Sequence, residues 1–216
     1  ASVRKGVYRV RSYELIAGER ISEVIHKEGG IRMKLDITKV YFSPREATER
    51  IRIAKQVRPE ETVMVMFAGV GPYALVIAKH QPRVRKVVAI EINPTAYNYM
   101  VENIRINGFK NKIVPILGDV RDKAKEWYGC CDRVVMPLPK GAYLYLSQAF
   151  RCLKDRGIVH FYHWALESDL FTNSYLLLER FAILNSRSIK ILNMRKVLPY
   201  APKIYKICID ALVIIS

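Results

Sequence analysis

Residues 66–74 read MFAGVGPYA, a glycine loop that follows the apolar run ETVMVMF and precedes an amphipathic stretch. The spacing Gly69-x-Gly71-x-x-Ala74 is typical of a turn that joins a strand to a helix and binds a nucleotide. In sheets built this way, ligands gather at the carboxyl ends of the parallel strands. The loop therefore predicts an α/β fold with a ligand site at this point, although the pattern alone does not identify the ligand.

Short apolar runs alternate with amphipathic stretches after this loop. The apolar runs are RKVVAIE, KIVPIL, CDRVVM and RGIVHFYH, and each precedes a stretch with helical character. This alternation favours a parallel sheet covered by helices on both faces. The last two apolar runs, near residues 189–198 and 204–214, are expected to form an antiparallel pair at one edge of the sheet.

The segment before the loop differs, because its first forty residues alternate in the manner of strands. We expect a small β-rich domain over residues 1–42 and a larger α/β domain over residues 43–216. Ser43 is expected to cap a helix that Pro44 opens, at a position where a missing N–H costs nothing. Because the chain begins ASVRKGVYRV without a methionine, a natural N-terminal part is expected to be absent.

The chain is strongly basic, with 36 Lys and Arg against 20 Asp and Glu and a formal net charge of +16. A length of 216 residues, half of them hydrophobic, suits one main globular domain. The charge favours a polyanionic partner such as a nucleic acid, although a lysine-rich thermophile surface is the alternative. The segment 185–206 contains basic and no acidic side chains and is the predicted RNA-binding stripe, together with one lysine beyond the MPLP loop: Arg187, Lys190, Arg195, Lys196, Lys203, Lys206 and Lys140.

The four cysteines, Cys130, Cys131, Cys152 and Cys208, form no C-x-x-C pair. Neither a zinc site nor a disulfide framework is indicated, so we expect no metal and a cytoplasmic location. The longest apolar runs are broken by charge and are too short to span a bilayer. No membrane association is expected, and a monomer is the simplest expectation.

Three features near the glycine loop bear on the choice between a dinucleotide and S-adenosylmethionine. Glu91 ends the next apolar run and can accept hydrogen bonds from both hydroxyls of a ribose, which suits either ligand. Pro72 removes a backbone N–H where a dinucleotide site presents donors to a pyrophosphate, and S-adenosylmethionine has no phosphate. Asp119 follows the third apolar run and can face the amine of an adenine. S-adenosylmethionine is therefore favoured over NAD. The alternative is a purely structural role, in which Gly69, Gly71 and Asp119 are only turn and cap residues.

Four segments together resemble the archaeal and eukaryotic tRNA guanine-37 N1-methyltransferases and their wyosine-pathway relatives. They are YRVRSYELIAGE, VYFSPREATER, MFAGVGPY with EINP, and the late YAP, and the resemblance covers essentially the whole chain. It implies a class I (Rossmann-like) S-adenosylmethionine-dependent methyltransferase sheet after a small β-rich lead-in, with residues 43–216 as the catalytic domain. It also implies methylation of guanosine-37 at N1 in tRNA, with the tricyclic wyosine precursor at that position as a second acceptor.

The resemblance assigns roles to individual residues. Glu49 matches the family's general base, and Arg9 matches its arginine near the guanine O6. N1 of guanine carries a proton at neutral pH, so a base must remove it, and an arginine then stabilises the charge that spreads onto O6. Without the resemblance, Glu49 is simply a helical partner of Arg52 on an exposed face. The residues implied or predicted to hold the cofactor are Tyr41, Arg45, Arg50, Phe67, Ala68, Gly69, Gly71, Glu91, Ile92, Asn93, Asp119, Val120 and Pro137.

Position 37 adjoins the anticodon, so the target base must be splayed out of its stack while the protein holds the RNA backbone. Two residues depart from the family's pattern. Val65 stands where the family usually has an acid that organises the methionine end of the cofactor, and Pro137 stands where the methylases usually have asparagine. In having proline at position 137, the chain resembles the archaeal wyosine-pathway variants. Methyl transfer is favoured; the alternatives are aminocarboxypropyl transfer to the wyosine precursor, a non-catalytic RNA-binding module, and a dinucleotide-dependent oxidoreductase.

Overall fold

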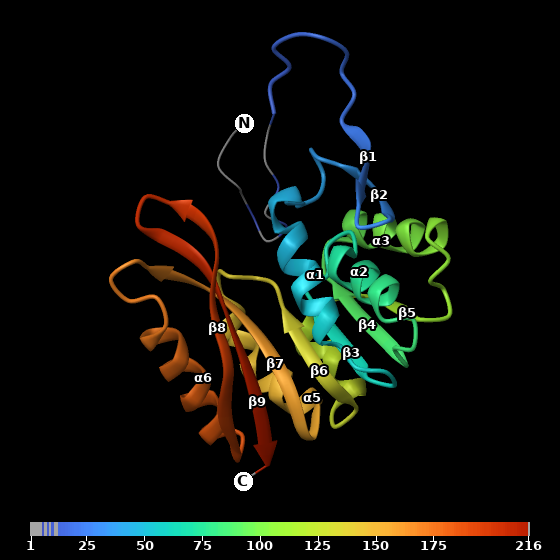
Figure 1. Cartoon of the computed structure of the whole chain (residues 1–216). Helices are drawn as coiled ribbons and strands as arrows, with labels where there is room; N and C mark the ends of the chain where they lie inside the picture. The colour runs from blue at the N-terminus through green and yellow to red at the C-terminus, as the bar shows by residue number, and fades with distance from the viewer. Residues whose placement is uncertain (1–5, 7, 9, 11–12, 216) are drawn as a thin grey trace.

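The centre of the molecule is a seven-stranded sheet with the strand order β5-β4-β3-β6-β7-β9-β8 (Figure 1). The computed structural model describes residues 6, 8, 10 and 13–215. The strands from β5 to β7 run parallel, and β9 is antiparallel to both β7 and β8. The expected antiparallel pair at one edge is therefore confirmed. The strands are β3 (Thr62–Met66), β4 (Lys86–Glu91), β5 (Ile113–Leu117), β6 (Cys131–Met136), β7 (Leu153–Leu166), β8 (Arg187–Ala201) and β9 (Ile204–Ile215).

Helices cover both faces of this sheet, as the alternating pattern predicts. Along β3, Val63 and Val65 belong to one buried cluster and Met64 and Met66 to the other, because successive side chains of a strand point to opposite faces. One cluster is covered by η1 (Pro44–Glu46), α1 (Ala47–Gln56), α2 (Pro72–His80) and α3 (Pro94–Ile106). The other is covered by α4 (Val120–Lys123), η2 (Ala124–Trp127), η3 (Ala142–Tyr145), α5 (Leu146–Cys152) and α6 (Thr172–Leu184).

An antiparallel hairpin, β1 (Glu23–Glu28) with β2 (Ile31–Asp36), precedes the sheet domain. The inward side chains of β2 join the same core as α2 and α3, and the Asn103 side chain bonds to both backbone groups of Lys34. The hairpin therefore has no core of its own. The described residues 13–18 lie in no strand, so the strand expected there is wrong over those residues.

The helix after the hairpin starts differently from the expectation. Pro44 opens a turn of 3-10 helix before α1, but the Ser43 side chain makes no capping hydrogen bond in the described structure. The carbonyl of Ser43 instead accepts a hydrogen bond of 3.1 Å from Nη1 of Arg50. The start of the helix is thus tied to a buried arginine rather than capped by a hydroxyl.

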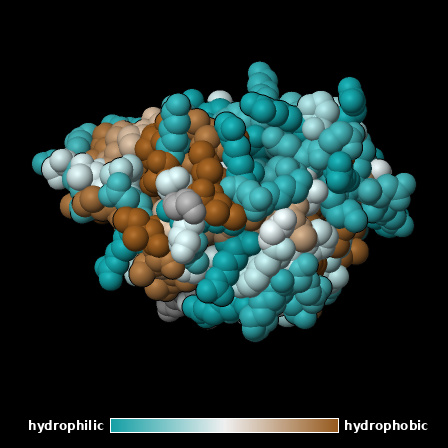
Figure 2. All heavy atoms as spheres, turned by 90° about the horizontal axis from the view of Figure 1, so that it is seen from below, coloured by the Kyte–Doolittle hydropathy of each residue, from teal (hydrophilic) through white to brown (hydrophobic). Residues whose placement is uncertain are grey.

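The surface seen from below, around the C-terminal end of the chain, is mostly hydrophilic, with apolar side chains gathered to one side (Figure 2). Exposed apolar residues near that end of the sheet include Ile183, Leu184 and Ile215. None of the helices in the described part of the chain is both long and apolar enough to cross a membrane.

Candidate active site

A cavity opens at the carboxyl ends of β3, β4, β5 and β6, where the loop analysis places the ligand. The β3–α2 loop forms one wall, and the segment between β2 and α1 forms another. Most of the predicted cofactor residues are brought together here: Tyr41, Arg50, Phe67, Ala68, Gly69, Glu91, Ile92, Asn93, Asp119, Val120 and Pro137.

Two predicted cofactor residues do not line this cavity. Arg45 is exposed on the first turn after Pro44. Gly71 adopts a φ of +90° as the residue that begins α2, and a Cβ there would come within 3.0 Å of the Met100 side chain. Gly71 therefore serves the backbone turn.

Glu91 ties the glycine loop to the next strand. Its Oε2 accepts a hydrogen bond of 2.6 Å from the Gly69 N–H, and its Oε1 accepts one of 2.7 Å from the Asn93 N–H. Burial raises the pKa of this carboxyl, and the backbone N–H groups of Asn93, Gly69 and Ile92 act in the opposite direction. A carboxylate has about four acceptor positions, so Glu91 can still accept from a ribose.

Two further features of the cavity support a nucleoside ligand. Asp119 caps α4 through the Arg121 N–H at 2.7 Å and also lines the cavity, so its cap role and its ligand role are compatible. Phe67 has a φ of +57°, a conformation that non-glycine residues seldom adopt and that concentrates at functional sites. Its ring meets that of Tyr145 edge-on at 4.9 Å, which gives the cavity an aromatic wall.

Glu49 lies beside the cavity and is only 3% exposed. Nε and Nη2 of Arg52 donate to its two oxygens at 2.8 and 2.7 Å, and the Tyr162 hydroxyl donates to Oε1 at 2.6 Å. Glu49 therefore does pair with Arg52, as expected for neighbours on one helix face. The pair is buried, however, and does not lie on an exposed face. Arg9 lies outside the described residues, so its position relative to Glu49 is not part of the structure.

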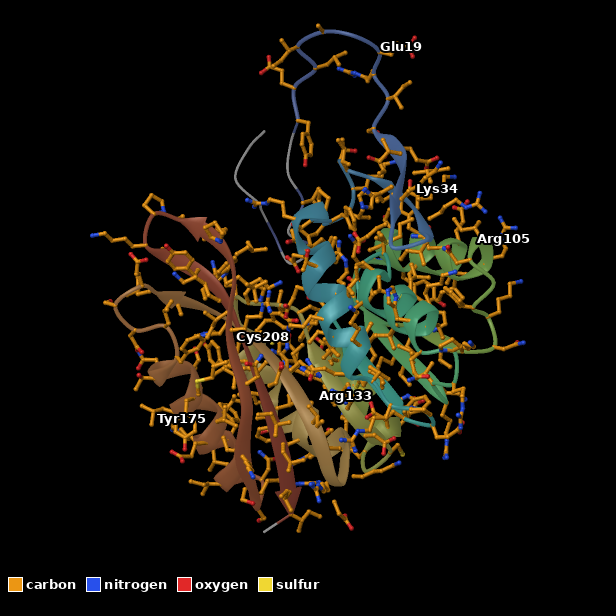
Figure 3. All side chains as sticks on the ribbon, viewed as in Figure 1. Glu19, Lys34, Arg105, Arg133, Tyr175 and Cys208 are labelled. Carbon is orange, nitrogen blue, oxygen red and sulfur yellow. The ribbon has the colours of Figure 1, made fainter. Side chains whose placement is uncertain are left out.

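A buried chain of charges continues behind Glu49. Nη1 of Arg52 contacts Oδ2 of Asp210 at 2.5 Å, and Asp210 contacts Nδ1 of His160 at 2.6 Å. Nε2 of His160 lies 2.7 Å from Nη1 of Arg133, whose Nε pairs with Glu61 at 2.8 Å. Figure 3 shows Arg133 and Cys208 among the side chains of the central sheet. His160, Cys208 and Asp210 are close enough to share a metal, but the two arginines already occupy this group.

Sequence reasoning missed several polar residues of the cavity, among them Glu46 and Tyr73. Nζ of Lys206 donates to Oε2 of Glu46 at 2.7 Å. Lys206 is only 2% exposed, so its assignment to the RNA-binding stripe is wrong: the side chain points inward toward α1 instead of outward. The sequence offered one indication for Glu46: it stands three residues before Glu49, on the same face of the predicted helix.

Of the other predicted RNA-binding residues, Arg187, Lys190, Arg195 and Lys196 lie on β8, Lys203 lies in the β8–β9 turn and Lys140 follows β6. Ala201 of β8 pairs with Ile204 at the end near the cavity, and Arg187 pairs with Ile215 at the opposite end. Arg187 donates to the carbonyls of Lys154 and Leu153 and so binds the start of β7. We therefore do not expect this side chain to contact RNA. The remaining predicted residues are exposed: Lys140, Lys190, Arg195, Lys196 and Lys203.

Comparisons with known proteins identify the family of this chain. The family model described as the TRM5/TYW2 methyltransferase domain matches residues 24–192. The tRNA (guanine(37)-N(1))-methyltransferase Trm5b of Pyrococcus abyssi is 43% identical over 95% of this chain and 60% of its own length. The tRNA(Phe) (4-demethylwyosine(37)-C(7)) aminocarboxypropyltransferase of Methanocaldococcus jannaschii is 35% identical over 95% of this chain and 81% of its own length.

Among solved structures, M. jannaschii TYW2 in complex with AdoMet superposes with a TM-score of 0.87. It is 34% identical, and the match covers 94% of this chain and 90% of that chain. The chain spans only about three fifths of the length of the Trm5b relative, 60%.

Proposed function

The chain belongs to the TRM5/TYW2 methyltransferase domain family, and on that basis we propose that it is an S-adenosylmethionine-dependent tRNA methyltransferase. Its proposed acceptor is N1 of guanosine-37, with the tricyclic wyosine precursor at the same position as a second acceptor. The observation that carries the proposal is the buried carboxylate of Glu91, which joins the glycine loop at the wall of the cavity. The 43% identity to a tRNA guanine-37 N1-methyltransferase supports the choice of acceptor.

The residues of the cavity fit a nucleoside without phosphates. Glu91 supplies acceptors for the ribose hydroxyls, and Asp119 is placed to accept from an adenine amine. Pro72 lines the same cavity and has no N–H to offer a pyrophosphate. S-adenosylmethionine supplies, when bound, a methyl group activated by a sulfonium.

Glu49 is the proposed general base for the guanine N1 proton. In the structure its carboxylate is held by Arg52 and Tyr162, which fix its orientation and leave one lone pair on Oε2 beyond the bond from Arg52. Nε of Arg195 lies 3.6 Å from the same oxygen, and the Arg195 side chain is partly exposed. The target guanine is therefore proposed to approach Glu49 from the side of Arg195. Arg9 is the proposed partner of the guanine O6.

The second candidate is transfer of the aminocarboxypropyl group to the wyosine precursor. It is supported by the 35% identity to an aminocarboxypropyltransferase, of whose length the chain covers 81%. The family resemblance of the glycine loop and of FSPREATER favours methyl transfer. Both reactions use the same cofactor and the same nucleotide, so the transferred group is what separates them.

A double-label experiment separates the two reactions. The protein is incubated with S-adenosylmethionine carrying tritium in the methyl group and carbon-14 in the carboxyl group, once with unmodified tRNA and once with tRNA that carries the tricyclic wyosine precursor at position 37. Methyl transfer puts tritium alone into nucleotide 37, whereas aminocarboxypropyl transfer puts carbon-14 there. The absence of both labels from nucleotide 37 would contradict either enzyme and favour the non-catalytic RNA-binding alternative.

The proposed partner is the anticodon region of tRNA, bound by a cytoplasmic monomer. Lys196 and Lys203 lie at the end of the β8–β9 hairpin near the cavity. Replacing both by alanine is expected to weaken tRNA binding and to reduce the slope of log K against log salt by about 2, since each contacts a phosphate. Filter binding between low and moderate salt measures the slope.

The matched control removes two exposed charges from the opposite end of the sheet. Arg83 and Arg85 precede β4, and their double alanine variant has the same net charge as the Lys196/Lys203 variant. An equal loss of slope in both variants would mean that overall charge, rather than this hairpin, attracts the RNA.

A further inference from the structure

Glu46 is a buried acid inside the cavity to which neither the ribose nor the proton transfer assigns a role. It is 5% exposed, and it lines the cavity together with Tyr41, Arg50 and Tyr73. Val65, where the family usually has an acid, lies on β3 with its side chain fully buried in the core beneath α2. The strand before the glycine loop therefore offers no carboxylate, and η1 offers one instead.

The Glu46 carboxylate pairs with a basic side chain behind it. Oε2 accepts from Nζ of Lys206 at 2.7 Å, and Oε1 accepts from the Tyr41 hydroxyl at 3.4 Å. Burial lowers the pKa of Lys206, and the charge and hydrogen bond of Glu46 act in the opposite direction. Lys206 also lies 4.6 Å from the centre of the Tyr162 ring, a contact that favours the charged ammonium. A carboxylate has about four acceptor positions, so Glu46 retains capacity for a second cation on the cavity side.

Tyr73 provides a second, independent observation at the same wall. It is 3% exposed and lines the cavity, and its hydroxyl has no hydrogen-bond partner among the described residues. Burial, and then the negative charges of Glu46 and Glu49, raise the pKa of Tyr73 well above its usual value. The hydroxyl therefore stays protonated and can donate. An unsatisfied buried hydroxyl is costly, so a ligand that accepts from it gains that energy.

Glu46 and Tyr73 line the same cavity as Asp119 and Glu91, the residues proposed to bind the nucleoside. The cavity extends from β5, where Asp119 follows the strand, past Glu91 on β4 to the loop after β3. Neighbouring strands are about 4.8 Å apart, so this path covers roughly 10 Å. An adenosine bound to Asp119 and Glu91 can extend the substituent on its 5′ carbon toward the β3 side, where Tyr73 lies in the first turn of α2; Glu46, the last residue of η1, lines the same cavity.

We propose that Glu46 and Tyr73 bind the amino-acid end of S-adenosylmethionine, with Glu46 accepting from the α-ammonium and Tyr73 donating to the α-carboxylate. The inference rests on the proposed function. In this arrangement Glu46, backed by Lys206, takes the place of the acid that is missing at Val65. Binding of the amino-acid chain then depends on the start of α1 rather than on β3.

The test compares S-adenosylhomocysteine with 5′-methylthioadenosine, which share the thioether nucleoside and differ only in the amino-acid chain. Binding of both to the purified protein is measured by isothermal titration calorimetry. Glu46→Gln is expected to weaken S-adenosylhomocysteine about 10- to 100-fold, the effect of losing one charge-assisted hydrogen bond in a buried site. Tyr73→Phe is expected to weaken it by about 10-fold. Neither variant should change the affinity for methylthioadenosine by more than about twofold.

Tyr73→Phe keeps the inference testable if the Glu46 variant misfolds. The Tyr73 hydroxyl bonds to no described residue, so its removal leaves no group unpaired. Glu61→Gln is the control for breaking a buried acid–arginine pair, here with Arg133, away from the cavity. It should leave both affinities unchanged. Equal weakening of both ligands by Glu46→Gln and Tyr73→Phe would overturn the inference, as would a wild-type protein that binds both ligands equally. A wild-type protein that binds neither ligand would overturn the proposed function itself.

Discussion

Replacing Glu49 by glutamine is expected to lower kcat for methyl transfer to tRNA about 100- to 10,000-fold, the usual contribution of a positioned general base. Glutamine keeps the shape of the side chain and can still accept from Arg52 and Tyr162, the two groups that hold Glu49. It cannot take the N1 proton. Because Glu49 lies beside the cofactor cavity rather than in its wall, the affinity for S-adenosylhomocysteine should stay within about twofold.

Single-turnover transfer of labelled methyl groups, with tRNA and cofactor saturating, measures this effect. Glu60→Gln is the control, because Glu60 is an exposed acid before β3 that pairs only loosely with Arg85 at 3.8 Å. Undiminished methylation by Glu49→Gln would show that another group removes the proton. A loss of rate that equals a loss of cofactor affinity would show that Glu49 has a binding role instead.

Replacing Asp210 by alanine is expected to lower the free energy of unfolding by about 3–5 kcal/mol, as when one partner of a buried ion pair is removed. Asp210 joins Arg52 of α1 to His160 of β7, and it is almost fully buried. Its loss leaves the Arg52 and His160 side chains without their shared acceptor. Urea unfolding followed by circular dichroism measures the change, with Asp122→Ala, an exposed acid on α4, as a control that should stay within about 0.5 kcal/mol.

The same cluster predicts how stability depends on pH. Burial lowers the pKa of His160, so His160 is neutral in the fold while the unfolded chain binds a proton below about pH 6.5. Hydrogen bonds from His160 and Arg52, together with the charge of Arg52, outweigh burial and lower the pKa of Asp210. Both groups therefore stabilise the fold at neutral pH, and both contributions are lost as the pH falls. Asp210→Ala should show a shallower loss of stability below pH 4 than the wild type; an unchanged acid slope would contradict this origin.

The sheet and the glycine loop were predictable because both rest on local patterns. Alternating apolar runs fixed the strands, and the helical stretches between them required helices on both faces, as the division of Val65 and Met66 between two cores confirms. Most residues assigned to the cofactor by family resemblance line the cavity, although their contacts with a ligand stay a prediction.

The wrong assignment of Lys206 has its physical cause in strand alternation. Lys206, Cys208 and Asp210 alternate along β9 and share the face beneath α1, which is why a lysine in a basic segment is buried. Composition counts such a lysine as surface charge. The partners of these residues, Glu46 and Arg52, are more than 150 residues away in the sequence, at separations of 160 and 158, so no local pattern could have joined them.

The central claim is that a nucleoside sulfonium lies in this cavity with its ribose on Glu91. Calorimetric titration of the purified protein with S-adenosylhomocysteine and with NAD tests it most directly. The account predicts one S-adenosylhomocysteine per chain, an affinity about 100-fold lower in Glu91→Ala for the loss of two hydrogen bonds to a carboxylate, and no binding of NAD. Binding of NAD, or S-adenosylhomocysteine binding that Glu91→Ala leaves unchanged, would contradict it.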